Sequence, residues 1–398
     1  MPQIWAGIDA GKTHHHCVVV DEEGKRLLSR KIANDESEIL ALLSEVAQLA
    51  DGAPICWATD MAQGGAALLI SILLDHGQPL LYLPGRAFHH AARSYRGEGK
   101  TDAKDAGIIA DQARMRRDLL PLRTGDQISI NLRMLTGRRT DLVCDRTRAI
   151  NRLRATLLEY FPALEAAFDY STTKTALVLL SEFQTPERLR EFRPDELADW
   201  IRGRGGYFPN RVAKQALTAA HSQHTTVAAQ QVGASIVARL AEQVLELRDE
   251  IAAIDAEIQA QLAEHQHAEG LLSVPGFGPL LAAEFLAATG GDMNTFETAD
   301  RLASIAGLAP APHDSGRVAG NLQRPRRYNR RLLRACFMAA QVAAAHCPVS
   351  KAFYQRKRKE GKNHKQAVLC LARRRINVIW AILRDGKLFT HQPLPAPV

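Results

Sequence analysis

The pattern of hydrophobic and polar positions changes between the N-terminal part of the chain and the rest. Three apolar segments come first and are expected to be strands, the last two joined by the turn DEEGK: 3–9, 15–20 and 26–32. Helical and extended patterns then alternate, with helices expected over 36–49 and 66–76 and strands over 55–59 and 79–83. Three antiparallel strands followed by alternating units predict a mixed α/β sheet with helices packed on it.

Beyond residue 100 the pattern is helical, and no further strand is expected. From Ile236 to Leu262 apolar residues recur at spacings of four and three, which is typical of a coiled-coil seam. Such a seam can lie in a helical bundle or pair two copies of the protein. After it, Gly276 and Gly278 separate two short helical stretches. This is the pattern of a helix–hairpin–helix that binds phosphate through backbone amides, or of an ordinary glycine-rich turn.

The chain is expected to have three parts. An α/β domain takes residues 1–150, a helical coiled-coil segment with a dimerisation role takes 151–268, and a mainly helical domain takes 269–398. No apolar run reaches the roughly 18 to 20 residues of a membrane helix, and no signal-peptide pattern opens the chain, so a cytoplasmic protein is expected. The six cysteines lack C-x-x-C spacing and are expected to be buried free thiols.

The basic residues are concentrated near the C-terminus. Residues 317–384 contain 18 Lys and Arg against one acidic residue, whereas the rest of the chain has 33 basic and 42 acidic residues. Basic runs such as QRPRRYNRRLLR can neutralise phosphates, and several runs interleaved with aromatic residues favour a nucleic-acid partner over a solvated face. The residues expected to contact nucleic acid are Arg317, Arg324, Arg326, Arg327, Arg330, Arg331, Lys357 and Arg358.

Four aspartates indicate a metal site in the N-terminal part. Asp9 ends the first expected strand and Asp60 follows the strand ICWAT, while Asp102 and Asp105 lie three residues apart at the start of a helix. Each alone has a simpler explanation, because an acid near a helix start often caps it and a single strand-end aspartate is more often structural. Together they are oxygen ligands suited to Mg²⁺, and two such ions roughly 4 Å apart stabilise the attacking and leaving oxygens of a phosphodiester.

Several of these segments resemble a known family. The motifs GIDAGK, ATD and KTDAKDAGIIA, followed by LLSVPGFGPLLAA and GLAPAPHDSGR, are similar to those of the DEDD transposases of insertion-sequence family 110. The resemblance covers nearly the whole chain, and the motifs are specific in combination. It implies an N-terminal RuvC-like, RNase H-like domain whose Asp, Glu, Asp, Asp quartet binds Mg²⁺ at Asp9, Asp60, Asp102 and Asp105. This chain departs from the quartet at Asp60, where the usual residue is glutamate.

The resemblance also implies roles for the C-terminal half. It places a catalytic serine nucleophile at Ser315, in the motif PHDSGR of a transposase domain. It implies a recombinase of a mobile element, associated with the nucleoid when it acts, in which a structured noncoding bridge RNA pairs with target and donor DNA. A homo-oligomer is expected, a dimer and then a tetramer in the synaptic complex, with the serine and the acids of one active site supplied by different chains.

Other interpretations of the same residues stay open. The acids fit a metal-dependent nuclease or junction resolvase that uses water as its nucleophile. Tyr328 or Tyr354, each among basic residues, could replace Ser315 as nucleophile, or the carboxylates could be structural in a scaffold that only binds nucleic acid. His313, two residues before Ser315, is a candidate proton acceptor. The histidines at 14–16 resemble a metal-binding run, but strand alternation sends neighbours to opposite faces, so they are expected to be structural.

Overall fold

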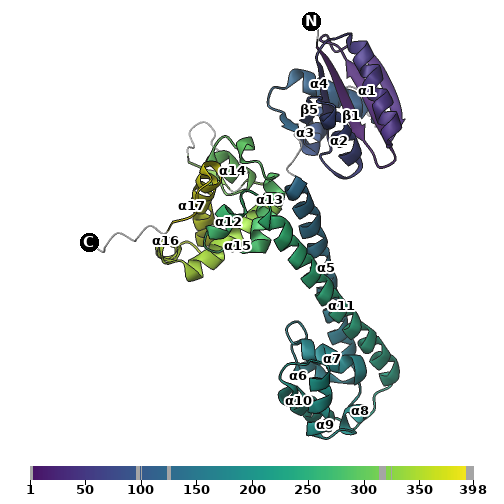
Figure 1. Cartoon of the computed structure of the whole chain (residues 1–398), viewed down its shortest axis with the longest axis vertical. Helices are drawn as coiled ribbons and strands as arrows, with labels where there is room; N and C mark the ends of the chain where they lie inside the picture. Colours follow the sequence, from purple (N-terminus) through teal and green to yellow (C-terminus); the bar gives the residue numbers. More distant parts are fainter. Residues whose placement is uncertain are drawn as a thin grey trace, which may run out of the picture. The chain divides into compact units, whose positions relative to one another are not determined.

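The chain folds into two compact units, Met1–Thr124 and Gly125–Val398 (Figure 1). The structure, a computed structural model, describes residues 3–95, 99, 101–122, 127–312, 320–323 and 325–390. Each unit has its own hydrophobic cores. Residue 150, where the sequence predicted the first domain boundary, lies inside a 34-residue helix of the second unit.

A six-stranded mixed sheet forms the centre of the first unit. Its strands are β1 (Ile4–Ala10), β2 (His14–Val20), β3 (Arg26–Ala33), β4 (Ile55–Thr59), β5 (Leu80–Tyr82) and β6 (Leu120–Leu122). They lie in the order β3-β2-β1-β4-β5-β6. β1, β2 and β3 form an antiparallel meander, and β1, β4 and β5 run parallel to one another. The mixed α/β sheet and the three-strand meander predicted from the sequence are thus confirmed.

Helices cover both faces of this sheet because its central strands are apolar on both sides. The helices are α1 (Glu36–Ala50), α2 (Ala67–Asp75), α3 (Gly85–Ala92) and α4 (Asp102–Met115). Ile4 and Ile8 of β1 are buried with α1 and α2, whereas Trp5 on the opposite face is buried with α4. A Cβ atom on Gly7 would lie 2.2 Å from the amide nitrogen of Ala110, so glycine allows α4 to pack closely on β1.

The expectation of no strand beyond residue 100 was wrong. β6 pairs antiparallel with β5 at the edge of the sheet, with Leu81 opposite Pro121. In the second unit, β7 (Ala311–Pro312) and β8 (Leu322–Gln323) form a further short pair. A segment of two or three residues is too short to show alternation, and proline cannot donate a backbone hydrogen bond, so it is tolerated at an edge. Tertiary pairing, and not local pattern, makes these segments strands.

Two long helices run side by side in the second unit and connect two helical groups (Figure 1). They are α5 (Gln127–Tyr160) and α11 (Gln230–Ala263). The first group is α6 (Pro162–Ala167), α7 (Lys174–Glu182), α8 (Pro186–Arg190), α9 (Pro194–Gly203) and α10 (Pro209–His221). The second is α12 (Ala268–Ser273), α13 (Pro279–Thr289), α14 (Ala299–Ile305), α15 (Arg330–His346), α16 (Pro348–Lys359) and α17 (His364–Asp385). Each group shares a core with one end of the α5–α11 pair.

The apolar seam predicted for a coiled coil packs on α5 of the same chain. Val244, Ile251 and Ile258 of α11 are buried, and Arg139 of α5 binds Asp255 of α11 through two hydrogen bonds. This is the arrangement expected of an amphipathic helix in a bundle. Pairing of two copies of the protein through this segment stays a prediction.

The predicted pair of short helices around Gly276 and Gly278 is present as α12, a turn and α13. Gly276 has a φ of 89°, and a Cβ atom there would lie 2.2 Å from the carbonyl oxygen of Ala339 in α15. Glycine is therefore needed both for the backbone conformation and for close packing on α15. Phosphate binding by this turn stays a prediction.

Two further expectations concern membranes and cysteines. In the described ranges no single helix is long and apolar enough to cross a membrane, although α15 and α16, bent by 100° at their junction, pass the same test as a pair. All six cysteines are free, but Cys144 is exposed and Cys370 is partly exposed, which corrects the expectation of six buried thiols. Cys144 lies on the solvent side of α5, a position that spacing alone does not reveal.

Candidate acidic site and nucleic-acid interface

Two of the predicted metal ligands lie at the ends of neighbouring parallel strands: Asp9 is the second-last residue of β1, and Asp60 directly follows β4. In the register of β1 and β4, Ile8 lies opposite Thr59, and Asp9 and Asp60 are the next residues on each side. Because side chains alternate between the two faces along each strand, Asp9 and Asp60 lie on the face of the sheet that carries Trp5. Helix α4 covers this face. The two aspartates therefore share one face and one end of the sheet.

The other two predicted ligands begin helix α4, which packs on that face. Thr101 caps the helix by accepting a backbone hydrogen bond, and Asp102 and Asp105 lie in the first turn. Asp102 is exposed, whereas Asp105 is only 8% exposed. Burial lowers the pKa of His16, the residue opposite Asp9, and the negative charge of Asp102 partly opposes this shift. Asp102 therefore lies within electrostatic reach of the strand next to β1.

The chemistry of these residues fits a hard divalent cation. All four are carboxylates, the ligands that Mg²⁺ prefers. Asp105 is buried, and its carboxylate accepts no hydrogen bond from the described residues, an environment in which a cation would stabilise it. In the described part of the chain, however, no three His, Cys, Asp or Glu side chains are grouped so that they could hold a metal ion. The structure brings the acids to one region, and the metal site itself stays a prediction.

The predicted catalytic serine and part of the basic run lie outside the described residues: Ser315, Arg317 and Arg324, together with His313. The arginines of the run that the structure describes are all exposed. They lie just before α15 or within its first turn: Arg326, Arg327, Arg330 and Arg331. Asn329 caps this helix by accepting hydrogen bonds from the backbone amides of Arg331 and Leu332, at 3.0 and 3.1 Å. Cations grouped at a capped helix N-terminus favour an anionic partner.

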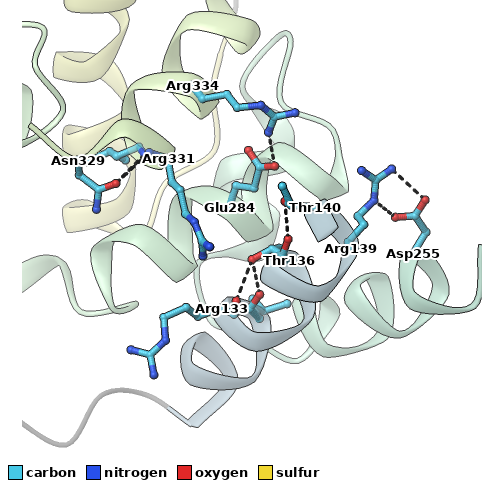
Figure 2. A network of polar contacts seen from close by, with 11 residues as sticks. Arg133, Thr136, Arg139, Thr140, Asp255, Glu284, Asn329, Arg331 and Arg334 are labelled. Atoms are coloured by element: carbon cyan, nitrogen blue, oxygen red, sulfur yellow. Dashed lines mark hydrogen bonds and ion pairs between the residues drawn. The ribbon is translucent and has the colours of Figure 1, made fainter. Parts of the chain in front are cut away.

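An arginine from a distant part of the sequence lies near the start of α15. Figure 2 shows Arg331 extending toward α5, where its guanidinium group lies 3.7 Å from the position of a Cβ atom on Gly137. Arg133, one turn earlier on α5, is partly buried, and burial together with the charge of Arg331 lowers the pKa of its guanidinium group. Neither guanidinium group has an ion-pair partner among the described residues. A phosphate would balance this pair of neighbouring charges.

Other arginines of the same network are already neutralised. Arg334 of α15 binds Glu284 of α13, and Arg139 of α5 binds Asp255 of α11 (Figure 2). The contrast singles out Arg133, which sequence reasoning missed. Arg133 lies far from the basic runs in the chain, and no local pattern marks it.

Lys357 and Arg358 differ in their availability to a ligand. The Lys357 ammonium group lies 2.7 Å from a Glu360 carboxylate oxygen and 5.7 Å from the centroid of the Phe353 ring. Arg358 is exposed. Of these two predicted nucleic-acid contacts, Arg358 therefore has the freer side chain.

The two tyrosines considered as nucleophiles have structural partners. The Tyr328 ring packs so closely on Gly307 that a Cβ atom there would lie 2.5 Å from the ring. The hydroxyl of Tyr354 lies 2.8 Å from Nδ1 of His364. Both tyrosines therefore have structural contacts, and a catalytic role for either stays a prediction.

Both ends of the chain match transposase families. Residues 6–162 match the DEDD transposases named for IS110, and residues 268–355 match the transposase family IS116/IS110/IS902. The chain belongs to the IS110 family of transposases. The uncharacterized 42 kDa protein of insertion element IS900 from Mycobacterium paratuberculosis is 56% identical over 386 residues, which cover 97% of each chain. The uncharacterized 44.8 kDa protein of insertion element IS116 from Streptomyces clavuligerus is 46% identical over 391 residues, or 98% of this chain and 97% of that protein.

A shorter match is to a protein with a different name. A pilin gene-inverting protein of Moraxella bovis is 32% identical over 130 residues, which cover 32% of this chain and 40% of that protein. The family membership itself rests on the longer matches.

As an IS110-family transposase, the protein is an insertion-element enzyme that cleaves and rejoins DNA. The first family match contains the four aspartates and Arg133, and the second contains Arg331. Residues 163–267, which include α7 to α10, lie between the two matches. The parts of the chain that carry the candidate acids and the arginine pair thus lie within the two family matches.

Proposed function

We propose that this transposase cuts and rejoins DNA by attack of the Ser315 hydroxyl on a phosphodiester, with Mg²⁺ held by Asp9, Asp60, Asp102 and Asp105. The observation that carries the proposal is the placement of the acids: two lie at adjacent strand ends, and two lie in the first turn of the helix that packs on the same face. The chain's membership of a DEDD transposase family supports the same role. A phosphoserine link conserves the bond energy, so strands can be resealed without ATP.

The charged groups would act on different parts of the DNA. When bound, Mg²⁺ supplies positive charge that stabilises the attacking and leaving oxygens. This help matters because a serine hydroxyl is a weak nucleophile near neutral pH. Arg133 and Arg331 would hold a backbone phosphate through charge-assisted hydrogen bonds and so position the strand.

We extend the proposal to a structured noncoding RNA that directs the transposase to target and donor DNA by base pairing. The sequence resemblance and the strongly basic segment 317–384 support this partner. Purification of the protein from its host, followed by sequencing of bound RNA, should give one defined species. A mixture of cellular RNAs with no enriched species would contradict RNA guidance.

The test of the serine mechanism is a denaturing gel of labelled DNA incubated with protein, guide RNA and Mg²⁺. Wild-type protein should give a slow band that disappears after protease treatment. Ser315→Ala should bind DNA and RNA but give neither this band nor recombinant product. If Ser315→Ala forms the same band, the nucleophile lies elsewhere.

A metal-dependent nuclease that uses water is the second candidate, and the same gel separates it from the first. It would release DNA with free ends and leave no covalent complex in wild-type protein. The name of the Moraxella bovis relative, a pilin gene-inverting protein, favours rejoining, since inversion of a gene requires that cut ends be joined again. Free ends alone from wild-type protein would establish hydrolysis.

A further inference from the structure

The loop between α9 and α10 exposes two adjacent aromatic side chains. Tyr207 and Phe208 are each 74% exposed, more than any other large apolar residue of the described chain. They lie outside both family matches and far in sequence from the basic C-terminal segment. Adjacent exposed aromatic side chains form a small apolar patch, and such patches on protein surfaces can mark interaction sites.

The backbone holds these rings in a strained and well-anchored conformation. Phe208 has φ 55° and ψ 47°, the left-handed region that a bulky residue rarely adopts. The Tyr207 amide donates to the buried hydroxyl of Thr175 at 2.9 Å, and that hydroxyl donates to the Tyr207 carbonyl oxygen at 3.1 Å. Gly206 also packs on Ile201 and Thr175, where a Cβ atom would not fit. Local strain that the surrounding structure enforces is typical of binding and catalytic sites.

A cavity of about 610 Å³ lies beside the two rings and is lined by both. Basic side chains from three elements line it as well: Lys174 of α7, Arg211 of α10 and Arg248 of α11. One acidic side chain, Asp169, also lines it, and its carboxylate accepts hydrogen bonds from Ser171 and Thr172. Arg248 donates to the Ser171 carbonyl oxygen at 3.2 Å and Lys174 lies 3.5 Å from Asp249, whereas Arg211 has no ion-pair partner within the described residues.

Two further polar groups in the cavity are available to a ligand. The Thr173 hydroxyl and the Gln215 amide both line it and make no side-chain hydrogen bond to described residues. The site therefore combines three kinds of group. It has aromatic rings for stacking, cations for phosphates, and unused polar groups for a base edge or sugar hydroxyl. This is the combination by which proteins bind unpaired nucleotides.

We propose that this aromatic loop and its cavity bind a single-stranded segment of nucleic acid, with bases stacked on Tyr207 and Phe208 and phosphates beside Arg211 and Arg248. The inference rests on the proposed action on nucleic acid and adds a second contact, separate from the arginines of α15. The basic side chains around the cavity outnumber its one acidic side chain three to one. This excess of positive charge favours a polyanion over a second copy of this chain, whose corresponding face would carry the same charge.

The test is binding of the full-length protein to labelled strands in EDTA, measured by fluorescence anisotropy. The probes are single strands of RNA and of DNA of about 12 nucleotides, and a duplex of the same length. Tyr207→Ala and Phe208→Gly should each weaken single-strand binding at least about fivefold and leave duplex binding unchanged. Glycine adopts a positive φ readily, so Phe208→Gly removes the ring while keeping the loop conformation. Phe208→Trp keeps a stacking surface and should bind like wild type.

Matched controls separate this site from general effects. Met134→Ala removes another exposed apolar side chain, 69% exposed on α5, and should bind all three probes like wild type. Arg211→Gln should weaken single-strand binding and reduce its salt dependence by about one charge. The ratio of RNA to DNA affinity reports whether the sugar hydroxyl is recognised. Ser315→Ala should bind the single strand normally, because binding in EDTA needs no cleavage, so failure of the recombination proposal would leave this result unaffected.

A second measurement locates the strand. A single strand carrying 5-iodouridine, irradiated on the protein, should cross-link to Tyr207 or Phe208, as identified by mass spectrometry. Unchanged single-strand affinity in both aromatic variants, or an equal loss of duplex binding, would overturn the proposal. A dimer that becomes monomeric in Phe208→Gly would show instead that this face joins two copies of the chain.

Discussion

Each of the four aspartates is expected to be essential for reaction and dispensable for folding. An aspartate-to-asparagine change keeps the shape of the side chain but removes the charge that holds a cation. Asp9→Asn, Asp102→Asn and Asp105→Asn should therefore abolish recombination while leaving thermal unfolding and DNA binding close to wild type. Asp60→Asn should also impair the reaction. Full activity of the Asp102 and Asp105 variants would rule out the metal site.

A buried histidine makes the first unit sensitive to acid. His15 is 1% exposed, and its Nε2 lies 2.9 Å from the Asn34 side-chain oxygen. The Asn34 amide nitrogen donates to the carbonyl oxygens of Lys12 and Gly65, so the oxygen faces the ring and Nε2 carries the proton. Nδ1 is buried without a hydrogen-bond partner, and burial lowers the pKa of His15. A second proton on this ring is therefore unfavourable in the folded protein.

The sign of the pH dependence follows from this lowered pKa. As pH falls below about 6.5, the unfolded chain binds a proton at His15 that the folded protein resists, so the free energy of unfolding decreases. His15→Gln removes the titrating group and should flatten the fall in melting temperature between about pH 7.5 and pH 5. His90→Gln, at an exposed position of α3 in the same unit, is the matched control. An identical pH profile in wild type and His15→Gln would contradict this account.

The arginine pair of the second unit should act on one phosphate. Arg133→Gln and Arg331→Gln should each reduce the salt dependence of duplex DNA binding by about one charge. Because both are expected to hold the same phosphate, the double variant should lose less affinity than the sum of the single losses. Arg138→Gln, which removes an arginine paired with Glu250, should have little effect. Unchanged salt slopes in both single variants would mean that the pair does not contact DNA.

At the scale of elements, the contact between β1 and α4 positions the acids and depends on one glycine. Gly7→Ala would place a Cβ atom 2.2 Å from the Ala110 amide nitrogen, a backbone atom that cannot move without shifting α4. We expect a loss of at least about 2 kcal/mol in the free energy of unfolding, measured by urea denaturation. Gly85→Ala meets no atom within 4 Å and should be close to neutral. Equal stability of the two variants would show that α4 does not pack on β1 in this way.

At the scale of the whole molecule, separate cores predict separate folding. The first unit buries both faces of its sheet under its own helices, and the second has cores at both ends of the α5–α11 pair. Fragments 1–124 and 125–398 should therefore each show native circular dichroism and a cooperative thermal transition. If either fragment is unfolded in isolation, contacts between the units contribute to its stability.

The sequence by itself determined the elements whose side chains follow a regular period. Ile4 and Ile8 alternate with Trp5 along β1, and this period of two is a local property that is visible before folding. The strand-end positions of Asp9 and Asp60 follow from the same pattern. The motifs also gave the transposase family, which the matches to known proteins confirmed.

Only the tertiary structure decided which distant segments meet. The apolar seam of α11 could have faced another chain, and it is α5 that covers it. β6 is a strand because β5 offers it an open edge. Arg133 lies within electrostatic reach of Arg331 because α5 passes the start of α15. A local pattern shows which face of an element is apolar or charged. The element that covers this face is set by packing between residues far apart in the chain. Such packing forms where the summed contacts outweigh the entropy cost of bringing the two segments together.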